Sequence, residues 1–385
     1  MKPQLSWWDR CVGLVDRLFA SPRFQRWATG FPLTRPIARR RARGLFDLVA
    51  GFVYAQVLFA AVRLRLFDIL YEGPQTLAEL APRLGLPEQG AARLLDAAVA
   101  LRLVEHRRRG RYGLGQLGHA MVGNPGIVAM IEHHSLLYAD LADPVALLRG
   151  ARGPTALGGY WPYAAAGGPG TEGPAALTPA QVAGYTDLMS ASQPFIAAEV
   201  LDAYDVGRHR CLLDVGGGDG RFLAEAAARA PALRVLLFDL PAVAARATAR
   251  FEAGGLSARA TAIGGDFRTD ALPQGADLVS LVRILHDHDD ATVRALLRAV
   301  RAALAPGGTL LIAEPLAATP GAEPVGDAYF GFYLMAMGRG RPRRAQELAG
   351  MLAEAGFDRI RTVRTRSPML TGLLLATAPG SSHLL

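Results

Sequence analysis

Acidic residues and a histidine lie at or after the ends of the predicted strands in the C-terminal half of the chain. Asp214 lies two residues before the glycine-rich run 216–220, Asp239 lies twenty-five residues after Asp214, and His286 follows a later strand. Glycine lets the backbone approach a ligand closely at the start of a helix. The run departs from the G-x-G-x-x-G spacing of dinucleotide sites, and Asp214 and Asp219 would repel a pyrophosphate. The loop therefore predicts a ligand that carries positive charge.

Two further strand ends suit the polar groups of a nucleoside. Asp239, in FDLP, can accept hydrogen bonds from both ribose hydroxyls. In GGDF, Asp266 can accept from an adenine amino group while Phe267 covers the ring. Each residue alone also fits a helix cap or a core aromatic. Their order at successive strand ends favours a nucleoside site.

His286, in RILHDHDD, has the chemistry of a general base. The reference pKa of imidazole is about 6.5, so much of it is neutral near pH 7. Residues 286–290 also look like a metal cluster, but neighbouring residues at a strand end diverge, and no second group has ligand spacing. Asp289 is more simply the N-cap of a helix over 291–304. We therefore expect no metal.

These acidic residues and His286 are far apart in the sequence. They can meet at one edge of a sheet only if strands and helices alternate along the chain. Helical segments rich in alanine separate the earlier strands, which predicts a doubly wound, mainly parallel α/β sheet. Ligands bind at the carboxyl ends of such strands. The predicted strands are 211–215, 234–238, 258–263, 277–282, 309–313, 359–365 and 370–377.

Residues 76–118 predict a compact winged helix-turn-helix. Thr76 and Glu79 have the spacing of a capping box, a second helix follows over 87–101, and two short strands flank Gly110. In a DNA-binding regulator with a ligand-sensing domain, the second helix would enter the major groove. That helix is mostly Ala and Leu, with few groups that read base edges. A structural use is therefore favoured, and no nucleic acid is expected.

The first 45 residues alternate aromatic and basic side chains, among them Trp7, Trp8 and Trp27. Such an arm suits an anionic membrane surface and suits a partner subunit equally well. Residues 44–62 are nearly long enough to span a bilayer. Asp47 within them is costly in lipid, which favours a buried or dimer-interface helix.

Composition sets the broad class of the protein. The 385 residues are 51% hydrophobic and 20% charged, which excludes a disordered chain. The net charge of +8 comes almost wholly from arginine and is no argument for nucleic acid. Two cysteines cannot form a disulfide framework, so we expect a cytoplasmic protein.

The ordered motifs VGGGDG, FDLP, GGDF, RILHDHDD, PGG and IAEP resemble those of small-molecule O-methyltransferases, the class that includes caffeic acid and acetylserotonin methyltransferases. The resemblance covers residues 45–378 and implies S-adenosylmethionine as cofactor, a Rossmann-like class I methyltransferase domain, a mostly helical winged-helix dimerisation domain and a homodimer. The expected boundaries are an arm over 1–45, the dimerisation domain over 46–148, a Gly/Pro-rich linker over 149–180 and the methyltransferase domain over 181–385.

The resemblance also implies roles for single residues. His286 matches the catalytic base and Glu314 the carboxylate that orients it. Many members carry a second glutamate in an E-R-T segment, where this chain has Pro342. The expected cofactor residues are Asp214, Gly216, Gly218, Asp219, Asp239, Leu240, Asp266, Phe267 and Arg283. The candidate substrate-pocket residues, which suit the core equally well, are Tyr138, Met189, Phe195, Phe332 and Met335.

Residues 21–58 are similar to bacterial methyltransferases that act on hydroxycarotenoids. This narrower resemblance implies methylation of the C-1 tertiary hydroxyl of an acyclic hydroxycarotenoid. An aromatic or polyketide hydroxyl is the alternative. A substrate that partitions into lipid would also suit peripheral contact with the cytoplasmic or photosynthetic membrane.

Overall fold

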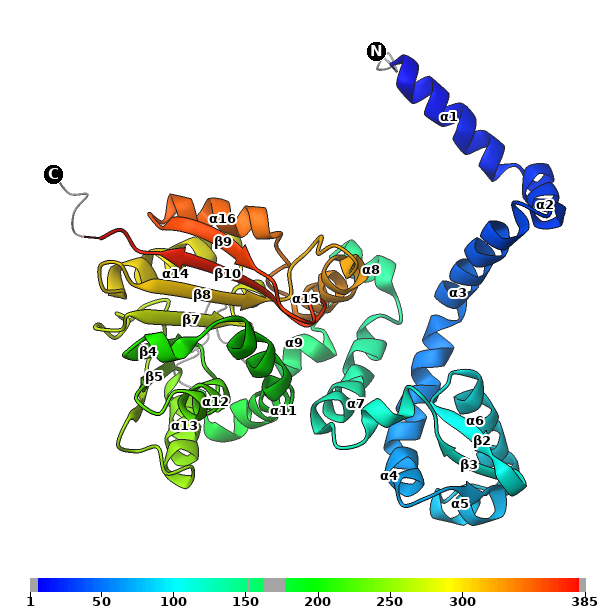
Figure 1. The fold of residues 1–385 in the computed structure, drawn as a ribbon, viewed down its shortest axis with the longest axis horizontal. Coiled ribbons are helices and arrows are strands. Elements are labelled where there is room, and N and C mark those ends of the chain that lie inside the picture. Colours follow the sequence, from blue (N-terminus) through cyan, green and yellow to red (C-terminus); the bar gives the residue numbers. More distant parts are fainter. Residues whose placement is uncertain (1–5, 151–152, 162–176, 381–385) are drawn as a thin grey trace. The chain divides into compact units, whose positions relative to one another are not determined.

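The computed structural model describes residues 6–150, 153–161 and 177–380. The chain divides into two compact units, Met1–Val122 and Gly123–Leu385 (Figure 1). Helix α7 (Pro125–Asp140) packs against α11 (Pro179–Ala203) and α15 (Gly331–Met337), so it belongs to the second unit. This division differs from the boundary at 148 expected from the sequence. The physical reason is that α7 buries Ile131, His133 and Leu137 within the second unit.

The first unit contains the predicted winged helix. Thr76 caps α5 in a capping box with Glu79, and the two wing strands pair in an antiparallel sheet of order β1-β3-β2. The prediction for residues 76–118 is therefore confirmed. The elements are α4 (Leu66–Tyr71), β1 (Gln75–Thr76), α5 (Leu77–Arg83), α6 (Glu88–Ala100), β2 (Val104–Arg107), η1 (Arg108–Gly110), β3 (Arg111–Leu114) and η2 (Gly118–Met121).

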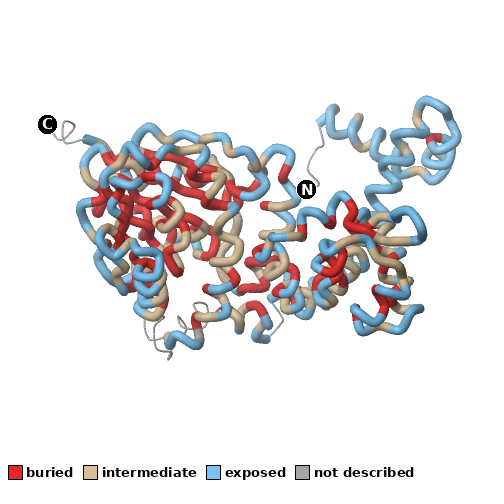
Figure 2. The backbone as a smooth tube through the Cα atoms, turned by 60° about the horizontal axis from the view of Figure 1, so that its bottom comes forward, coloured by how far each residue is buried: buried red, intermediate tan, exposed pale blue. Residues whose placement is uncertain are grey.

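Three helices precede the winged helix: α1 (Trp7–Ala20), α2 (Pro22–Gly30) and α3 (Arg35–Arg63). They expose most of their apolar side chains, as the pale tube in Figure 2 shows. Within the described residues, α3 alone is long and apolar enough to cross a membrane by length and composition. The buried part of α3 is its end, at Ala61 and Val62.

The second unit is built on a seven-stranded sheet of order β6-β5-β4-β7-β8-β10-β9. Five neighbouring strands are parallel, whereas β10 runs antiparallel to both β8 and β9. The chain reverses its direction of winding at β4, which creates a crevice between β4 and β7. The strands are β4 (Cys211–Val215), β5 (Arg234–Asp239), β6 (Ala260–Gly264), β7 (Leu278–Val282), β8 (Thr309–Glu314), β9 (Asp358–Val363) and β10 (Gly372–Thr377).

Helices cover both faces of this sheet. On one face α14 (Asp290–Ala303) and α16 (Ala345–Glu354) bury leucines and valines, and on the other α11, α12 (Arg221–Arg229) and α13 (Pro241–Ala253) do so. In Figure 2 the backbone at the centre of this unit is coloured as buried. Each fully buried Leu or Val contributes about 1.5–3 kcal/mol relative to an exposed one. The predicted doubly wound α/β fold is confirmed.

A smaller apolar cluster includes buried Leu157 and Trp161. Both fall within the expected linker, so this part of it packs against the fold. Tyr163, also in that segment, lies outside the described residues. The elements here and nearby are α8 (Pro144–Leu148), α9 (Ala156–Tyr160), the 3-10 turns η4 (Val206–Arg208) and η5 (Leu285–Asp287), and the π-helix η6 (Pro324–Phe330).

Candidate active site

A cavity lies at the carboxyl ends of β4, β5 and β7, at the point where the winding reverses. All nine residues expected to hold the cofactor line it, from the glycine loop after β4 to Arg283 after β7. Parallel strands end at one edge of a sheet, so residues far apart in sequence meet there. The remaining walls include Trp161 and the α11 residues Tyr185 and Met189.

The glycine loop needs glycine for its backbone shape. Gly216 and Gly218 have φ of 70° and 62°, in the region that side chains rarely adopt. The N–H of Gly216 donates to the carbonyl of Phe238 at 2.8 Å, and that of Gly218 donates to Oδ2 of Asp239 at 2.8 Å. These bonds fix the loop against the end of β5.

Asp214 is a buried carboxylate with an unused oxygen. Its Oδ1 accepts from the hydroxyl of Ser280 at 2.6 Å, whereas Oδ2 has no hydrogen-bond partner among the described residues. Burial raises the pKa of Asp214 to about 7, although the Ser280 bond acts in the opposite direction. A buried, half-satisfied carboxylate beside a glycine loop suits a cationic ligand.

Asp239 ends β5 with both carboxylate oxygens in use. Oδ1 accepts from the N–H of Leu240 at 2.7 Å, and Oδ2 accepts from Gly218. Burial raises the pKa of Asp239 to about 6 against the effect of these bonds. Each oxygen retains a lone pair, so the carboxylate can still accept two hydroxyl protons.

Two expected cofactor residues carry ion pairs that the sequence analysis missed. Arg250 pairs with Asp219, and its Nε donates to the Asp219 carbonyl at 3.0 Å. Arg268 binds Asp266 in a fork, with its Nη2 2.7 Å from Oδ2. Burial alone would raise the pKa of Asp266, but the Arg268 bonds outweigh it and lower the pKa. Asp219 is therefore neutralised, and an adenine amino group would share Asp266 with Arg268.

His286 is held by the predicted carboxylate. Its Nδ1 lies 2.5 Å from Oε2 of Glu314, and Oε1 of the same glutamate accepts from the N–H groups of Ile284 at 2.8 Å and Leu285 at 2.6 Å. Both His286 and Glu314 are buried. A carboxylate at Nδ1 fixes the tautomer that leaves Nε2 as the proton acceptor.

Asp287 is a second carboxylate at this histidine, and sequence reasoning missed its role. Its Oδ1 lies 3.2 Å from Nε2 of His286, and its Oδ2 accepts from the Tyr185 hydroxyl at 3.3 Å. Burial would lower the pKa of His286, but Asp287 and Glu314 outweigh it and raise the pKa. Asp287 lines the cavity, whereas His286 lies behind it. The sequence feature that could have indicated this role is the position of Asp287 directly after His286 in RILHDHDD.

Arg283 adopts a left-handed backbone, with φ of 60°. Such conformations cost of order 1–3 kcal/mol outside glycine and cluster at functional sites. Its guanidinium donates to the Ser192 hydroxyl at 2.8 Å and lies 2.9 Å from the Met189 sulfur. The turn after β7 thus directs Arg283 toward α11 and the cavity.

The expected substrate pocket is only partly assembled. Of its five residues, Met189 alone lines the cavity. Phe195 is 41% exposed on α11, and Phe332 and Met335 lie half-buried on α15. Tyr138, on α7, packs near the ring of His134. The structure therefore brings only Met189 to the cavity, and a pocket role for the other four residues stays a prediction.

No group of three or more His, Cys, Asp or Glu that could hold a metal ion occurs within the described residues. Asp289 instead accepts from the N–H of Thr292 at 2.8 Å and caps α14, as predicted.

A doubly wound sheet with a carboxylate-lined cavity and a carboxylate-held histidine is the arrangement that the sequence predicts for a methyltransferase. The chain belongs to the O-methyltransferase family: residues 138–358 match its O-methyltransferase domain, and residues 46–124 match its dimerisation domain. It is an S-adenosylmethionine-dependent O-methyltransferase, as expected from the sequence. The dimerisation domain supports the expected homodimer.

Named relatives agree with this family. The chain is 42% identical over 366 residues to the demethylspheroidene O-methyltransferases of Cereibacter sphaeroides, with 95% of both chains covered, and of Rhodobacter capsulatus, with 95% and 89% covered. It is 36% identical to acetylserotonin O-methyltransferase of Mus musculus, with 86% and 87% covered. The structure of human N-acetylserotonin methyltransferase in complex with SAM superposes with a TM-score of 0.72 at 26% identity, covering 89% of this chain and 98% of that one.

Proposed function

We propose that this enzyme methylates the C-1 tertiary hydroxyl of an acyclic hydroxycarotenoid, giving a methoxy carotenoid and S-adenosylhomocysteine. The observation that carries the proposal is 42% identity to demethylspheroidene O-methyltransferases over 95% of the chain. Relatives named for aromatic substrates are less similar, at 36% identity for acetylserotonin and 32% for a naphthoate. The carotenoid is therefore favoured over an aromatic or polyketide hydroxyl.

The residues of the cavity fit the proposed cofactor. The unpartnered Oδ2 of buried Asp214 suits the positive methionine end, and Asp239 suits the ribose. Asp266 and Phe267 suit adenine, with the amino group sharing Asp266 with Arg268. When bound, S-adenosylmethionine supplies a methyl group on a sulfonium, which makes the methyl carbon electrophilic.

We propose that Nε2 of His286 accepts the proton of the substrate hydroxyl. Glu314, on Nδ1, keeps the ring in the tautomer that can do so and stabilises the imidazolium that forms. When the acceptor enters, the substrate hydroxyl would replace Oδ1 of Asp287 as the group in contact with Nε2 of His286. A tertiary alcohol is far less acidic than a phenol, so proton transfer accompanies or follows bond formation to oxygen. Alignment and exclusion of water then dominate the rate.

The direct test is methyl transfer from labelled S-adenosylmethionine. Purified enzyme is incubated with 1-hydroxyneurosporene in liposomes, with a catechol and a simple phenol in parallel, and the label is located by chromatography. We expect label in the carotenoid. Label only in the phenols would leave the family intact and remove the proposed substrate. A His286→Ala variant serves as the matched control for label that does not depend on the site.

We expect cofactor binding to weaken as the pH falls from about 8 to 5.5. The raised pKa values of Asp214, about 7, and Asp239, about 6, mean that both carboxylates take up protons over this range and lose the charge that a cation needs. The expected loss of affinity is on the order of tenfold, one pKa unit being about 1.4 kcal/mol. Isothermal titration calorimetry in two buffers of different ionisation enthalpy measures affinity and proton release together.

The Asp214→Asn variant is the control for this pH dependence. It should bind the cofactor more weakly and lose the part of the dependence near pH 7. An affinity of the native enzyme that stays constant between pH 8 and 5.5 would contradict a role for these carboxylates.

We infer that the enzyme works on the cytoplasmic side of a membrane and that the arm, residues 1–45, contacts it peripherally. In α1, Trp7 and Trp8 are 75% and 68% exposed, and no residue of this helix is buried. Arginines surround these rings, and the arm precedes the matched dimerisation domain at residue 46. Exposed rings and arginines together suit an anionic lipid surface, where the proposed substrate would be found.

A variant with Trp7, Trp8 and Phe19 changed to serine should sediment less with vesicles that contain phosphatidylglycerol. The native enzyme should bind, and added salt should weaken its binding because arginine charges contribute. Met369→Ser removes an exposed apolar side chain of the second unit, 56% exposed, and should change nothing. Equal sedimentation of the arm variant and the native enzyme would remove the membrane role. Binding that only detergent reverses would indicate that α3 inserts.

A further inference from the structure

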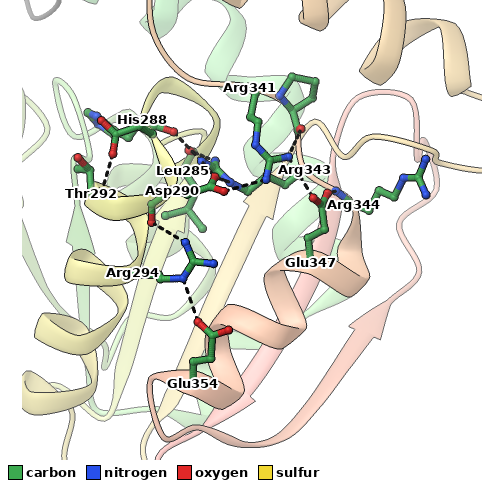
Figure 3. A network of polar contacts seen from close by, with 12 residues as sticks. Leu285, His288, Asp290, Thr292, Arg294, Arg341, Arg343, Arg344, Glu347 and Glu354 are labelled. Carbon is green, nitrogen blue, oxygen red and sulfur yellow. Dashed lines mark hydrogen bonds and ion pairs between the residues drawn. The ribbon is translucent and has the colours of Figure 1, made fainter.

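Arg343 binds the backbone of the loop that carries His286. Its side chain is the largest of the fully buried side chains described, at 2% relative exposure. Nη1 donates to the carbonyl of Leu285 at 2.6 Å, and Nη2 donates to the carbonyl of His288 at 2.7 Å (Figure 3). One guanidinium thus connects the two ends of the turn that contains His286 and Asp287.

Neighbours of Arg343 complete the contact with this turn. The N–H of Arg341 donates to the carbonyl of His286 itself at 2.9 Å. Gly340 lies directly against this carbonyl with φ of 78°, where an added Cβ would collide. The carbonyls of residues 285, 286 and 288 are therefore all bound by the segment 341–343.

Asp290 fixes the guanidinium in turn. Its Oδ1 accepts from Nε and Nη2 of Arg343 at 3.0 and 2.7 Å, and its Oδ2 accepts from Nη2 of Arg341 at 3.1 Å (Figure 3). A planar guanidinium can make these bonds and still reach both carbonyls, whereas a lysine ammonium cannot reproduce the fork. A buried cation is tolerated only when it is bonded in this way.

We propose that Arg343 is a positioning residue for the methyl transfer. It holds the 285–288 turn so that Nδ1 of His286 stays on Glu314 and Nε2 stays directed at the acceptor. The segment lies where many family members carry a second orienting glutamate, and this chain has Pro342 there. Here the segment orients the histidine through its backbone instead of a second carboxylate. The inference rests on the proposed role of His286 as the base.

The test is Arg343→Lys, with Arg294→Gln as the matched control. Arg294 pairs with Glu354 at 2.9 Å at the edge of the same network but touches no carbonyl of the turn. We expect Arg343→Lys to lower kcat about 10- to 100-fold, because small displacements of a reacting group cost this much. The dissociation constant of S-adenosylmethionine should stay within about twofold, since Arg343 does not line the cavity. The control should keep native kcat.

A pH profile separates positioning from general stability. Glu314 and Asp287 hold the pKa of His286 above its usual value. A loosened turn weakens these contacts, so the pKa should fall and the acidic limb of kcat should move to lower pH while the maximum drops. A change in melting temperature alone would not move this limb. Native kcat with an unmoved limb in Arg343→Lys would overturn the proposal.

Asp290→Asn provides a second route if Arg343→Lys does not fold. The amide keeps one oxygen for Arg343 but loses the charge and the acceptor for Arg341. We expect kcat to fall less than in Arg343→Lys, and the acidic limb of the pH profile to move to lower pH as well. Native kcat with an unmoved limb would overturn the proposal. Full turnover by a His286→Ala variant would instead refute the proposed base, so failures of the two proposals are distinguishable.

Discussion

Replacement of His286 with alanine is expected to lower kcat by about 10²–10⁴-fold, the usual contribution of a positioned general base. Cofactor affinity should change little, because His286 lies behind the cavity and none of the nine expected cofactor residues depends on its side chain for a hydrogen bond. The proton of the acceptor would then have no imidazole to receive it. Single-turnover methyl transfer, together with calorimetric binding of S-adenosylmethionine, measures the two effects separately.

Glu314→Gln is the informative companion to this variant. An amide can still accept from the N–H groups of Ile284 and Leu285, but it presents N–H in place of Oε2 to the Nδ1 of His286. We expect turnover between the native and His286→Ala values. Glu354→Gln, on the surface of α16, is the matched control. Retention of most turnover without His286 would leave proximity as the source of catalysis and exclude the base.

The cofactor half of the site was predictable because its signals are local. Each motif places a carboxylate or glycine at or near the carboxyl end of a strand, and a parallel sheet brings all such positions to one edge. Asp214, Asp239 and Arg283, on three different strands, consequently line one cavity. The strand boundaries themselves were within two residues for the five parallel strands.

Pairings across the sequence were not predictable. Arg250 neutralises Asp219, 31 residues earlier in the chain, and nothing in the spacing of the charges indicates which of many arginines does so. Tyr185 reaches Asp287 from α11, 102 residues earlier in the chain. The direction of the Tyr185 side chain depends on how α11 is rotated about its axis against the sheet. No single residue of the sequence predicts that rotation.

The candidate substrate residues are brought together only in part, for the same reason. Met189 and Phe195 both lie on α11, six residues apart, so a helix of 3.6 residues per turn directs them to different sides. Phe195 is exposed while Met189 contacts Arg283. The domain boundary expected at 148 differs from the division after Val122 for a similar reason. The apolar residues of α7 do not show by themselves which unit they pack against, and the structure places this helix in the second unit.

Replacement of Asp239 with alanine is expected to weaken binding of S-adenosylmethionine by about 10²–10⁴-fold. The carboxylate would supply two charge-assisted hydrogen bonds to the ribose, each worth about 1.5–3 kcal/mol, and 1.4 kcal/mol is tenfold in affinity. Its loss also leaves the N–H groups of Gly218 and Leu240 without their acceptor, so the glycine loop loses its anchor on β5. Calorimetry with S-adenosylmethionine and with S-adenosylhomocysteine measures the loss.

The comparison of those two ligands tests the cause. Both carry the same ribose, so an effect through Asp239 should be equal for them, whereas Asp214, beside the expected positive end, should discriminate in favour of the sulfonium. Asp358→Ala, an exposed carboxylate at the start of β9, is the matched control and should bind both ligands as the native enzyme does. Native affinity in Asp239→Ala would mean that the ribose lies elsewhere, and the strand-end carboxylates would then lose their common explanation as one nucleoside site.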